Sequence, residues 1–201
     1  MFVSCGNKNN KLVVTGNEKE RVILGDTSEI KEKKYVSSFK SVNISCASTV
    51  DIKIGHEYSV IIDGQKAYVD AQRVVSDNGI LKLSFDSDYP VKKNTHVVIT
   101  TPYLDAIKLS RCGMVTVHGN AINVKTFSLD LDKINVVKIN SKIISHRTDV
   151  KINNLMFTSI MTDCDELFLN TNNVSHIQIL GKVKHYRYIG GEKRNIGMKK
   201  T

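Results

Sequence analysis

The sequence predicts an all-β protein, mainly a β-solenoid, and three features carry this prediction. Between residues 42 and 140, short runs alternate apolar with polar side chains, which is the period of a half-buried strand. The second half also repeats weakly, in units too short for a helix pair or a propeller blade. Two-residue turns of the kind that join antiparallel hairpins are almost absent from that half, which argues against a β-sandwich.

The first 34 residues differ in composition from the rest of the 201-residue chain. Residues 4–11 are polar and typical of a tether, and residues 17–34 are rich in charged side chains. We expect little fixed structure before residue 35, apart from a candidate strand at residues 21–24. The sequence therefore predicts a tether over residues 1–34 and a folded β-solenoid domain over residues 35–201.

In the first half of the folded domain, strands are expected at residues 42–45, 50–54, 59–62, 81–85 and 97–100. Two dipeptides, Asp63-Gly64 and Asn78-Gly79, are typical of tight hairpin turns, because the residues of such turns favour positive φ. The N-terminal portion of the domain is therefore expected to be more sandwich-like than the rest. Residues 67–75 fit either one helical turn or a further irregular strand.

In the second half, strands are expected at residues 107–109, 115–117, 127–131 and 136–139. Comparable units begin at Leu109, Leu129, Ile144 and Ile160, at intervals of 20, 15 and 16 residues. A single coil of a solenoid buries little apolar surface, so the stacking of coils creates the core. Several asparagines are candidates for side-chain ladders along the stack, namely Asn153, Asn154, Asn170, Asn172 and Asn173.

The order and spacing of these segments resemble a bacterial family of unknown function, described as a putative auto-transporter adhesin, head GIN domain. The similar segments are residues 36–44, 50–55, 58–64, 75–83 and 97–110, and the most specific of them contains Pro102. The resemblance implies a right-handed β-solenoid and a location in the cell envelope or outside the cell, and it does not imply an enzyme. The chain departs from the family at its turns, where larger residues such as Arg111 and Lys133 replace small, glycine-rich ones.

Cys5 is a candidate site of lipid modification. Residues 2–6 resemble the end of a bacterial lipoprotein signal, in which a small residue precedes the modified cysteine, and a polar tether follows. The sequence has no charged and no apolar segment before Cys5, so either the start codon lies within a longer signal or Cys5 is a surface thiol. With lipidation, we expect an envelope lipoprotein that touches the membrane only through its lipid, at the outer membrane, in the periplasm or on the cell surface.

The net charge of +9 arises from 29 basic and 20 acidic residues. Many lysines lie on the polar phase of expected strands, as Lys82, Lys108 and Lys138 do, so they indicate solvated faces rather than nucleic-acid binding. The four cysteines and six histidines show no metal-ligand spacing, and no nucleophile, phosphate-loop or dinucleotide motif is present. We therefore expect no catalytic residue, metal, cofactor or specific nucleic-acid partner.

Two groups of residues are candidates for a binding site. Tyr186 and Tyr188 lie on one face of an expected strand, where they would form either a stacking platform for sugar rings or a cap over the last coil. The acidic turns around Asp132 and Asp165 would form a cation site or an acid–base pair only if the coils bring them together. Otherwise these turns are solvated.

The leading expectation is a non-enzymatic binding or adhesion module of the cell envelope, which presents a rigid β surface to a glycan or a protein. The first alternative is a structural protein that assembles end to end through the edges of the solenoid. The second alternative is a polysaccharide-cleaving β-helix enzyme, which requires converging carboxylates in a groove.

Overall fold

The computed structural model describes residues 11–12, 23–24, 28–45, 47, 49–85, 95–191 and 196–199. Within these residues the regular structure is almost all β-strand, with one short helix, α1 (Lys66–Asp70), so the predicted all-β class is confirmed. The strands are β1 (Lys11–Leu12), β2 (Ile23–Leu24), β3 (Glu29–Lys34), β4 (Ser41–Ser45), β5 (Thr49–Ile54), β6 (Ser59–Gln65), β7 (Gln72–Asp77), β8 (Ile80–Phe85), β9 (His96–Thr101), β10 (Ala106–Ser110), β11 (Met114–Gly119), β12 (Ile122–Leu180), β13 (Val183–Gly190) and β14 (Ile196–Lys199).

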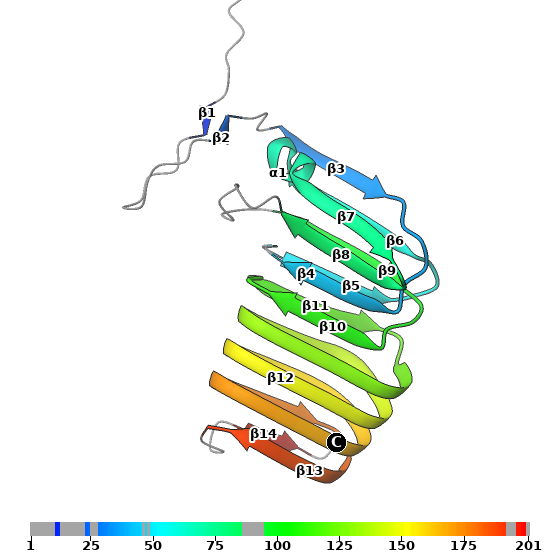
Figure 1. The fold of residues 1–201 in the computed structure, drawn as a ribbon, viewed down its shortest axis with the longest axis vertical. Helices are drawn as coiled ribbons and strands as arrows, with labels where there is room; N and C mark the ends of the chain where they lie inside the picture. The colour runs from blue at the N-terminus through cyan, green and yellow to red at the C-terminus, as the bar shows by residue number, and fades with distance from the viewer. Residues whose placement is uncertain are drawn as a thin grey trace, which may run out of the picture.

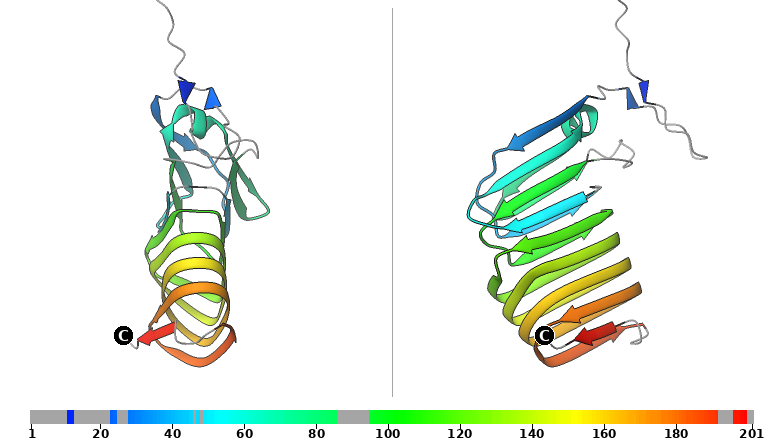
Figure 2. Two further views of the ribbon diagram at one scale, coloured as in Figure 1. Left: turned by 90° about the vertical axis from the view of Figure 1, so that its left-hand side faces the viewer. Right: turned by 180° about the vertical axis from the view of Figure 1, so that it is seen from behind.

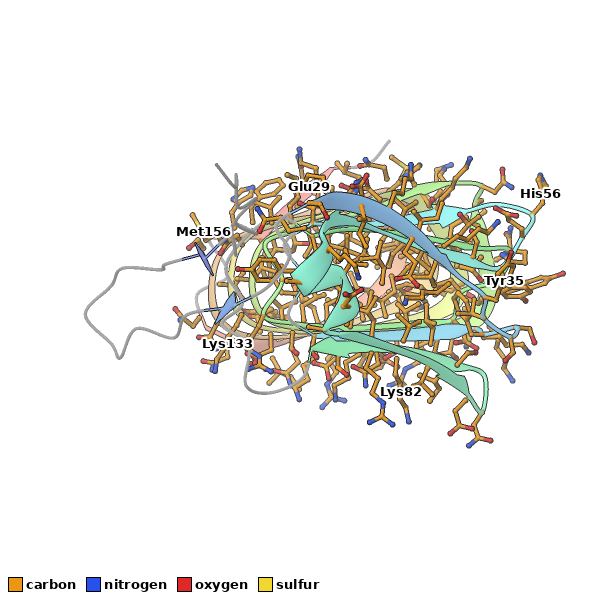
Figure 3. The ribbon with its side chains drawn as sticks, turned by 90° about the horizontal axis from the view of Figure 1, so that it is seen from above. Glu29, Tyr35, His56, Lys82, Lys133 and Met156 are labelled. Atoms are coloured by element: carbon orange, nitrogen blue, oxygen red, sulfur yellow. The ribbon has the colours of Figure 1, made fainter. Side chains whose placement is uncertain are left out.

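All strands except β1 and β2, which pair with each other, belong to one 12-stranded, mostly parallel sheet. Its order is β3-β6-β9-β5-β11-β12-β10-β4-β8-β7, with β13 and β14 also paired to β12. The sheet nearly closes on itself. Figure 3 looks along the stack and shows two walls with side chains packed between them, Glu29 on one wall and Lys82 on the other. We call the wall that contains β5 and β11 the first wall, and the wall that contains β4 and β10 the second wall.

Strand β12 is 59 residues long because the chain winds without interruption through successive coils (Figures 1 and 2). Residues 128–132 of β12 extend the second wall beside β10, and residues 136–139 extend the first wall beside β11. Inward side chains of successive strands therefore stack and are buried, as Ile107 and Leu129 are. Full burial of one such aliphatic side chain contributes about 1.5–3 kcal/mol to stability, which explains why the alternating pattern dictates this arrangement.

Left-handed backbone conformations mark one corner of the coils. Arg111, Lys133, Asn154 and Asn173 have φ between 51° and 54°, and their numbers differ by 22, 21 and 19. Asparagine adopts this conformation more readily than most residues, because its short polar side chain bonds locally. The expected ladder is present at this corner for two asparagines, since Asn173 donates a hydrogen bond of 2.8 Å to the side-chain oxygen of Asn154.

The coil length differs from the expected repeat. The intervals of 20, 15 and 16 residues are too short, because Leu109 pairs with Leu131 and not with Leu129. Ile144, which was expected to begin a unit, is exposed. Alternation within a strand repeats every two residues, so a shift of the whole repeat by two positions leaves the apolar pattern unchanged. The pattern therefore predicts the strands but not the phase of the repeat.

Antiparallel pairing is confined, among the described strands other than β1 and β2, to β3–β6, β6–β9 and β7–β8 in the N-terminal half. As predicted, Asn78-Gly79 forms the hairpin turn, between β7 and β8, with φ of 49° and 74°. Asp63-Gly64 does not form a turn, because both residues lie within β6 and pair with β3. The segment 67–75 contains both expected alternatives, a short helix and then the start of β7.

The sheet begins at Glu29, before the expected start near Tyr35. Although β3 is charged, its alternate residues are half-buried, and it pairs along its full length with the edge of β6. Cys112 and Cys164 are buried, whereas Cys5 and Cys46 lie outside the described residues, as do residues 193–195 and 200 near the C-terminus. In the part of the chain that the structure describes, no helix has the length and apolarity needed to span a bilayer.

Candidate ligand-binding cleft

The inward face of β13 carries both tyrosines that the sequence indicated as a candidate site. Tyr186 pairs with Leu167 and Tyr188 with Leu169, so both tyrosines continue a register of buried core leucines. Their rings stack with centroids 6.4 Å apart and planes inclined by 20°. Because no further coil is described beyond β13, this placement favours the interpretation as a cap over the last coil. Binding of sugar by these rings stays a prediction.

Hydrogen bonds and burial hold this pair of rings. The hydroxyl of Tyr188 donates to the carbonyl oxygen of Gly191 at 2.8 Å and lies 3.0 Å from the Thr171 hydroxyl. Burial raises the pKa of Tyr186 to about 12, and the adjacent Tyr188 adds to this shift. Tyr186 nevertheless remains 38 % exposed, which is typical of a residue that closes the end of a core rather than one inside it.

The outward side of the same region contains a shallow cleft of about 240 Å³, on the second wall near the β13 end of the stack. Four strand segments contribute to it, namely three passes of β12 (residues 128–130, 149–151 and 168–170) and β13, which follows β12 on this wall. In the parallel pairing of β12 with β13, Arg187 lies beside Phe168, and Ile189 lies beside Asn170. The cleft is lined by Ser128, Leu129, Asp130, Asp149, Val150, Lys151, Phe168, Leu169, Asn170, Arg187 and Ile189.

An arginine fixes the aromatic side of this cleft. The guanidinium carbon of Arg147 lies 4.1 Å from the centroid of the Phe168 ring, a cation–π contact. The Nε of Arg147 also donates to both carboxylate oxygens of Asp149, at 2.9 and 3.0 Å. The ring, the guanidinium and the carboxylate therefore restrain one another, so this part of the cleft is ordered before any ligand arrives.

The charges of the cleft do not cancel. Asp149 is paired with Arg147, and Asp130 lies 3.8 Å from the ammonium group of Lys108. The side chains of Lys151 and Arg187 are exposed, and neither has a hydrogen-bond or ion-pair partner among the described residues. Both carboxylates of the cleft thus have a cation of their own, and two further cations remain for a ligand.

Asp132 and Asp165, at the centres of the two acidic turns, do not line this cleft and contact other groups of the protein. Asp132 accepts a hydrogen bond of 3.3 Å from Asn154, in the corner ladder. Asp165 lies 2.6 Å from the ammonium group of Lys184 and 2.8 Å from Nδ1 of His146, and these contacts lower the pKa of Asp165. The two carboxylates share no partner, and no group of three metal-ligating side chains occurs in the described part of the chain.

A neighbouring carboxylate completes a small network at the corner that contains Asp165. Asp163 accepts a hydrogen bond of 2.9 Å from the backbone N–H of Lys182 and lies 3.1 Å from the ammonium group of Lys142. The backbone hydrogen bond is the main reason why the pKa of Asp163 is lowered, and the lysine charge adds to it. These contacts link adjacent coils across their turns.

Sequence reasoning did not assign Phe168, Asp149 or Ile189 to a site. The sequence contains a signal for Phe168. Leu167-Phe168-Leu169 places three apolar residues in a row and so breaks the alternation. With Leu167 and Leu169 buried, Phe168 must face outward. An apolar residue on the outward phase of a strand is a candidate contact for a ligand or partner.

A family model described as "Putative auto-transporter adhesin, head GIN domain" matches residues 38–196. The chain belongs to this family. The match covers most of the chain and includes every strand that lines the cleft, so the resemblance seen in the sequence is confirmed.

A solved structure of low sequence identity shares this fold. The chain is similar to a putative adhesin from Bacteroides fragilis, with a TM-score of 0.54 and 14 % identity over 87 % of this chain and 98 % of that one. It is also similar to a putative adhesin from Parabacteroides merdae (TM-score 0.45, 11 % identity, 88 % and 98 % covered). A putative cell adhesion protein from Clostridium sporogenes has a TM-score of 0.41 and 8 % identity, with 87 % and 100 % covered. No protein of curated function matches the chain.

Proposed function

We propose that this protein is a non-enzymatic binding or adhesion module of the cell envelope, built as a right-handed β-solenoid, which holds a glycan or protein on its second wall. The observation that carries the proposal is the cleft at the β13 end, where an ordered aromatic ring lies beside two unpaired cations. Membership of a family described as adhesin head domains supports the same function. A stack of hydrogen-bonded strands supplies the rigidity that lets shallow contacts add up, because little ordering is lost on binding.

The arrangement of the two ends suits such a module. Figure 1 shows β3 at one end of the stack and β13 with β14 at the other. The cleft involves β13, whereas the N-terminal region that contains the candidate lipidation site Cys5 precedes β3 in the chain. Lipid attachment at Cys5 would therefore direct the cleft away from the membrane and toward a ligand.

The charges around the acidic turns favour binding over hydrolysis. A glycosidase needs one carboxylic acid with a raised pKa to protonate the leaving group, beside a second carboxylate at a defined separation. The pKa values of Asp163 and Asp165 are lowered instead, by a backbone N–H and by lysines. Carboxylates held in their charged form by structural partners suit the cross-linking of coils better than proton transfer.

One observation favours end-to-end assembly as a second function. Ile189 and Met198 are large apolar residues that remain exposed on β13 and β14, the two strands at the end of the stack. Their exposed edges would allow another chain to continue the sheet. Sedimentation velocity over a wide range of protein concentrations tests this directly: growth of oligomers with concentration supports assembly, and an unchanged monomer contradicts it.

A glycan array with cleft-blocking variants tests the proposed function. Ser128 is exposed in the cleft, so Ser128→Tyr would fill the space without touching the core. Thr116→Tyr is the matched control, because Thr116 faces outward on β11 of the first wall. We expect the wild type to bind a subset of glycans at both about 0.1 M and about 1 M salt. Ser128→Tyr should abolish that binding, whereas Thr116→Tyr should leave it intact. Equal loss in both variants would contradict the proposal, and no binding to any glycan would leave a protein as the ligand.

A further inference from the structure

We propose that the ligand of the cleft is a sugar that carries a carboxylate, such as a uronic acid unit of an acidic polysaccharide. This inference rests on the proposed function and narrows it to a chemical class. Three observations point to the class: two cations without a partner, an apolar surface beside them, and a volume of about 240 Å³. A uronic acid unit has a carboxylate for the two cations, C–H groups for the apolar surface, and the size of a single sugar ring.

The charge of the ligand follows from the pairing inside the cleft. Asp149 has Arg147 and Asp130 has Lys108, so these carboxylates have little attraction left for a cationic ligand. The side chains of Arg187 and Lys151 are exposed and have no hydrogen-bond or ion-pair partner among the described residues. The planar guanidinium of Arg187 presents two parallel N–H donors, a geometry that fits a carboxylate. Lys151 would add a second, less directional positive charge.

The apolar surface argues for a sugar rather than an inorganic anion. Ile189 is 55 % exposed, and the partly exposed Phe168 ring is held in place by Arg147. One face of a sugar ring presents C–H groups, and contact with aliphatic or aromatic side chains removes that face from water. The exposed Asn170 amide and Ser128 hydroxyl lie in the same cleft as partners for the ring hydroxyls.

The size and charge distribution argue against larger anions. The volume is below the about 300–1,000 Å³ typical of pockets for drug-sized ligands, so the cleft suits a single ring of a longer chain. A nucleic acid would follow a continuous basic stripe with several stacking rings. Here the described lining of the cleft offers only two unpaired cations, Lys151 and Arg187, and one aromatic ring, Phe168.

The test is a titration with a matched pair of probes. One probe is an oligosaccharide of galacturonic acid, and the other is the same oligosaccharide with its carboxyl groups reduced to primary alcohols. Isothermal titration with the full chain should show affinity for the acidic probe at least about ten-fold higher than for the neutral one. An oligomer of glutamic acid is the third probe, because it presents carboxylates without a sugar ring.

Variants assign the preference to named side chains. Arg187→Ala and Lys151→Ala should each weaken binding of the acidic probe several-fold to about ten-fold, with little effect on the neutral probe. Arg187→Lys should give an intermediate affinity, since it keeps the charge and loses the two-pronged geometry. Lys138→Ala is the control, because Lys138 is an exposed lysine of the first wall that pairs with Thr116. All four variants change exposed residues, and thermal unfolding should confirm that they fold normally.

The outcomes separate this inference from the proposed function. Equal affinity for the acidic and neutral probes, with both blocked by Ser128→Tyr, would overturn the inference and leave the binding module intact. Equal weakening by Lys138→Ala and Arg187→Ala would also overturn it, because the effect would then be general electrostatics. Tight binding of the glutamate oligomer at about 1 M salt would reassign the cleft to acidic peptides. Failure to bind any glycan of the array would overturn this inference and leave the proposed module with a protein ligand.

Discussion

The inward and outward faces of strand β13 have different roles in the protein. On the inward face, Tyr186 and Tyr188 follow the register of buried leucines and close the core. On the outward face, Arg187 and Ile189 complete the cleft. Tyrosine and arginine are both common in binding sites, yet only one pair is placed where a ligand can approach from the side. The lesson is that the phase of a residue within its strand decides its role.

The largest expected effect is a loss of stability, which should differ between substitutions on the inward and the outward face of β13. Tyr188→Ala removes a ring that packs on the core and leaves Thr171 without the tyrosine hydroxyl, so we expect the free energy of unfolding to fall by about 3 kcal/mol. Arg187→Ala, one residue away, should change it by no more than about 0.5 kcal/mol. Urea unfolding followed by circular dichroism measures both values. Similar losses in the two variants would remove the distinction between the faces.

Two adjacent glycines at the end of β13 sharpen the same comparison. Gly190 has φ of 148°, and a Cβ there would clash with the carbonyl oxygen of Thr171 on the preceding coil. Gly191 has open space around it. We expect Gly190→Ala to cost about 2 kcal/mol and Gly191→Ala less than about 0.5 kcal/mol in the same unfolding assay. A reversed order would mean that the close approach of β13 to the coil above is not as described.

A substitution at one inward-facing position is expected to increase the free energy of unfolding. Thr158 is fully buried, and its hydroxyl has no hydrogen-bond partner among the described residues. Thr158→Val keeps the shape and removes the unpaired hydroxyl, so we expect the free energy of unfolding to rise by about 1 kcal/mol. Thr116→Val, on the outward phase of β11, is the control and should be neutral. A loss of stability in Thr158→Val would show that the buried hydroxyl has a partner such as water.

The smallest expected effect is the pH dependence of stability that arises from Asp163, at the corner of the coils that contains Asp165. Because the pKa of Asp163 lies below its ordinary value of 3.8 in the folded protein, its contribution to stability is present above that value. The contribution is lost as the pH falls through the lowered pKa. Asp163→Asn should therefore be less stable than the wild type at about pH 6, and the difference should shrink toward about pH 3. Chemical unfolding at both pH values gives the comparison, and a constant difference would contradict the assigned role.

The strands could be predicted from the sequence because alternation is a local signal. The expected strand at residues 81–85 became β8 (Ile80–Phe85), and the one at residues 97–100 became β9 (His96–Thr101). Strand β3 was missed since its lysines and glutamates hide the alternation, and half-buried Ile30 is the one apolar residue within it. The single β12 was seen as separate runs, because corner residues such as Lys133 resemble a break in a strand.

The cleft could not be predicted, because it depends on which residues of different coils become neighbours. Asp149, Phe168 and Arg187 belong to successive passes of the second wall. Coils that differ in length by one to three residues change those neighbours without changing any local pattern. A periodicity of two does not by itself tell which set of alternate residues faces outward. Arg187 can be assigned to the outward face only once Tyr186 is known to face inward.

The division between a structural inward face and a binding outward face of β13 is tested most directly by one pair of titrations. The galacturonic acid oligosaccharide would be titrated into Tyr186→Leu, which keeps an apolar side chain over the last coil, and into Arg187→Glu, which reverses one charge of the cleft. We expect Tyr186→Leu to bind as the wild type does and Arg187→Glu to lose binding. Loss of binding in Tyr186→Leu with retention in Arg187→Glu would instead identify the stacked tyrosines as the sugar platform.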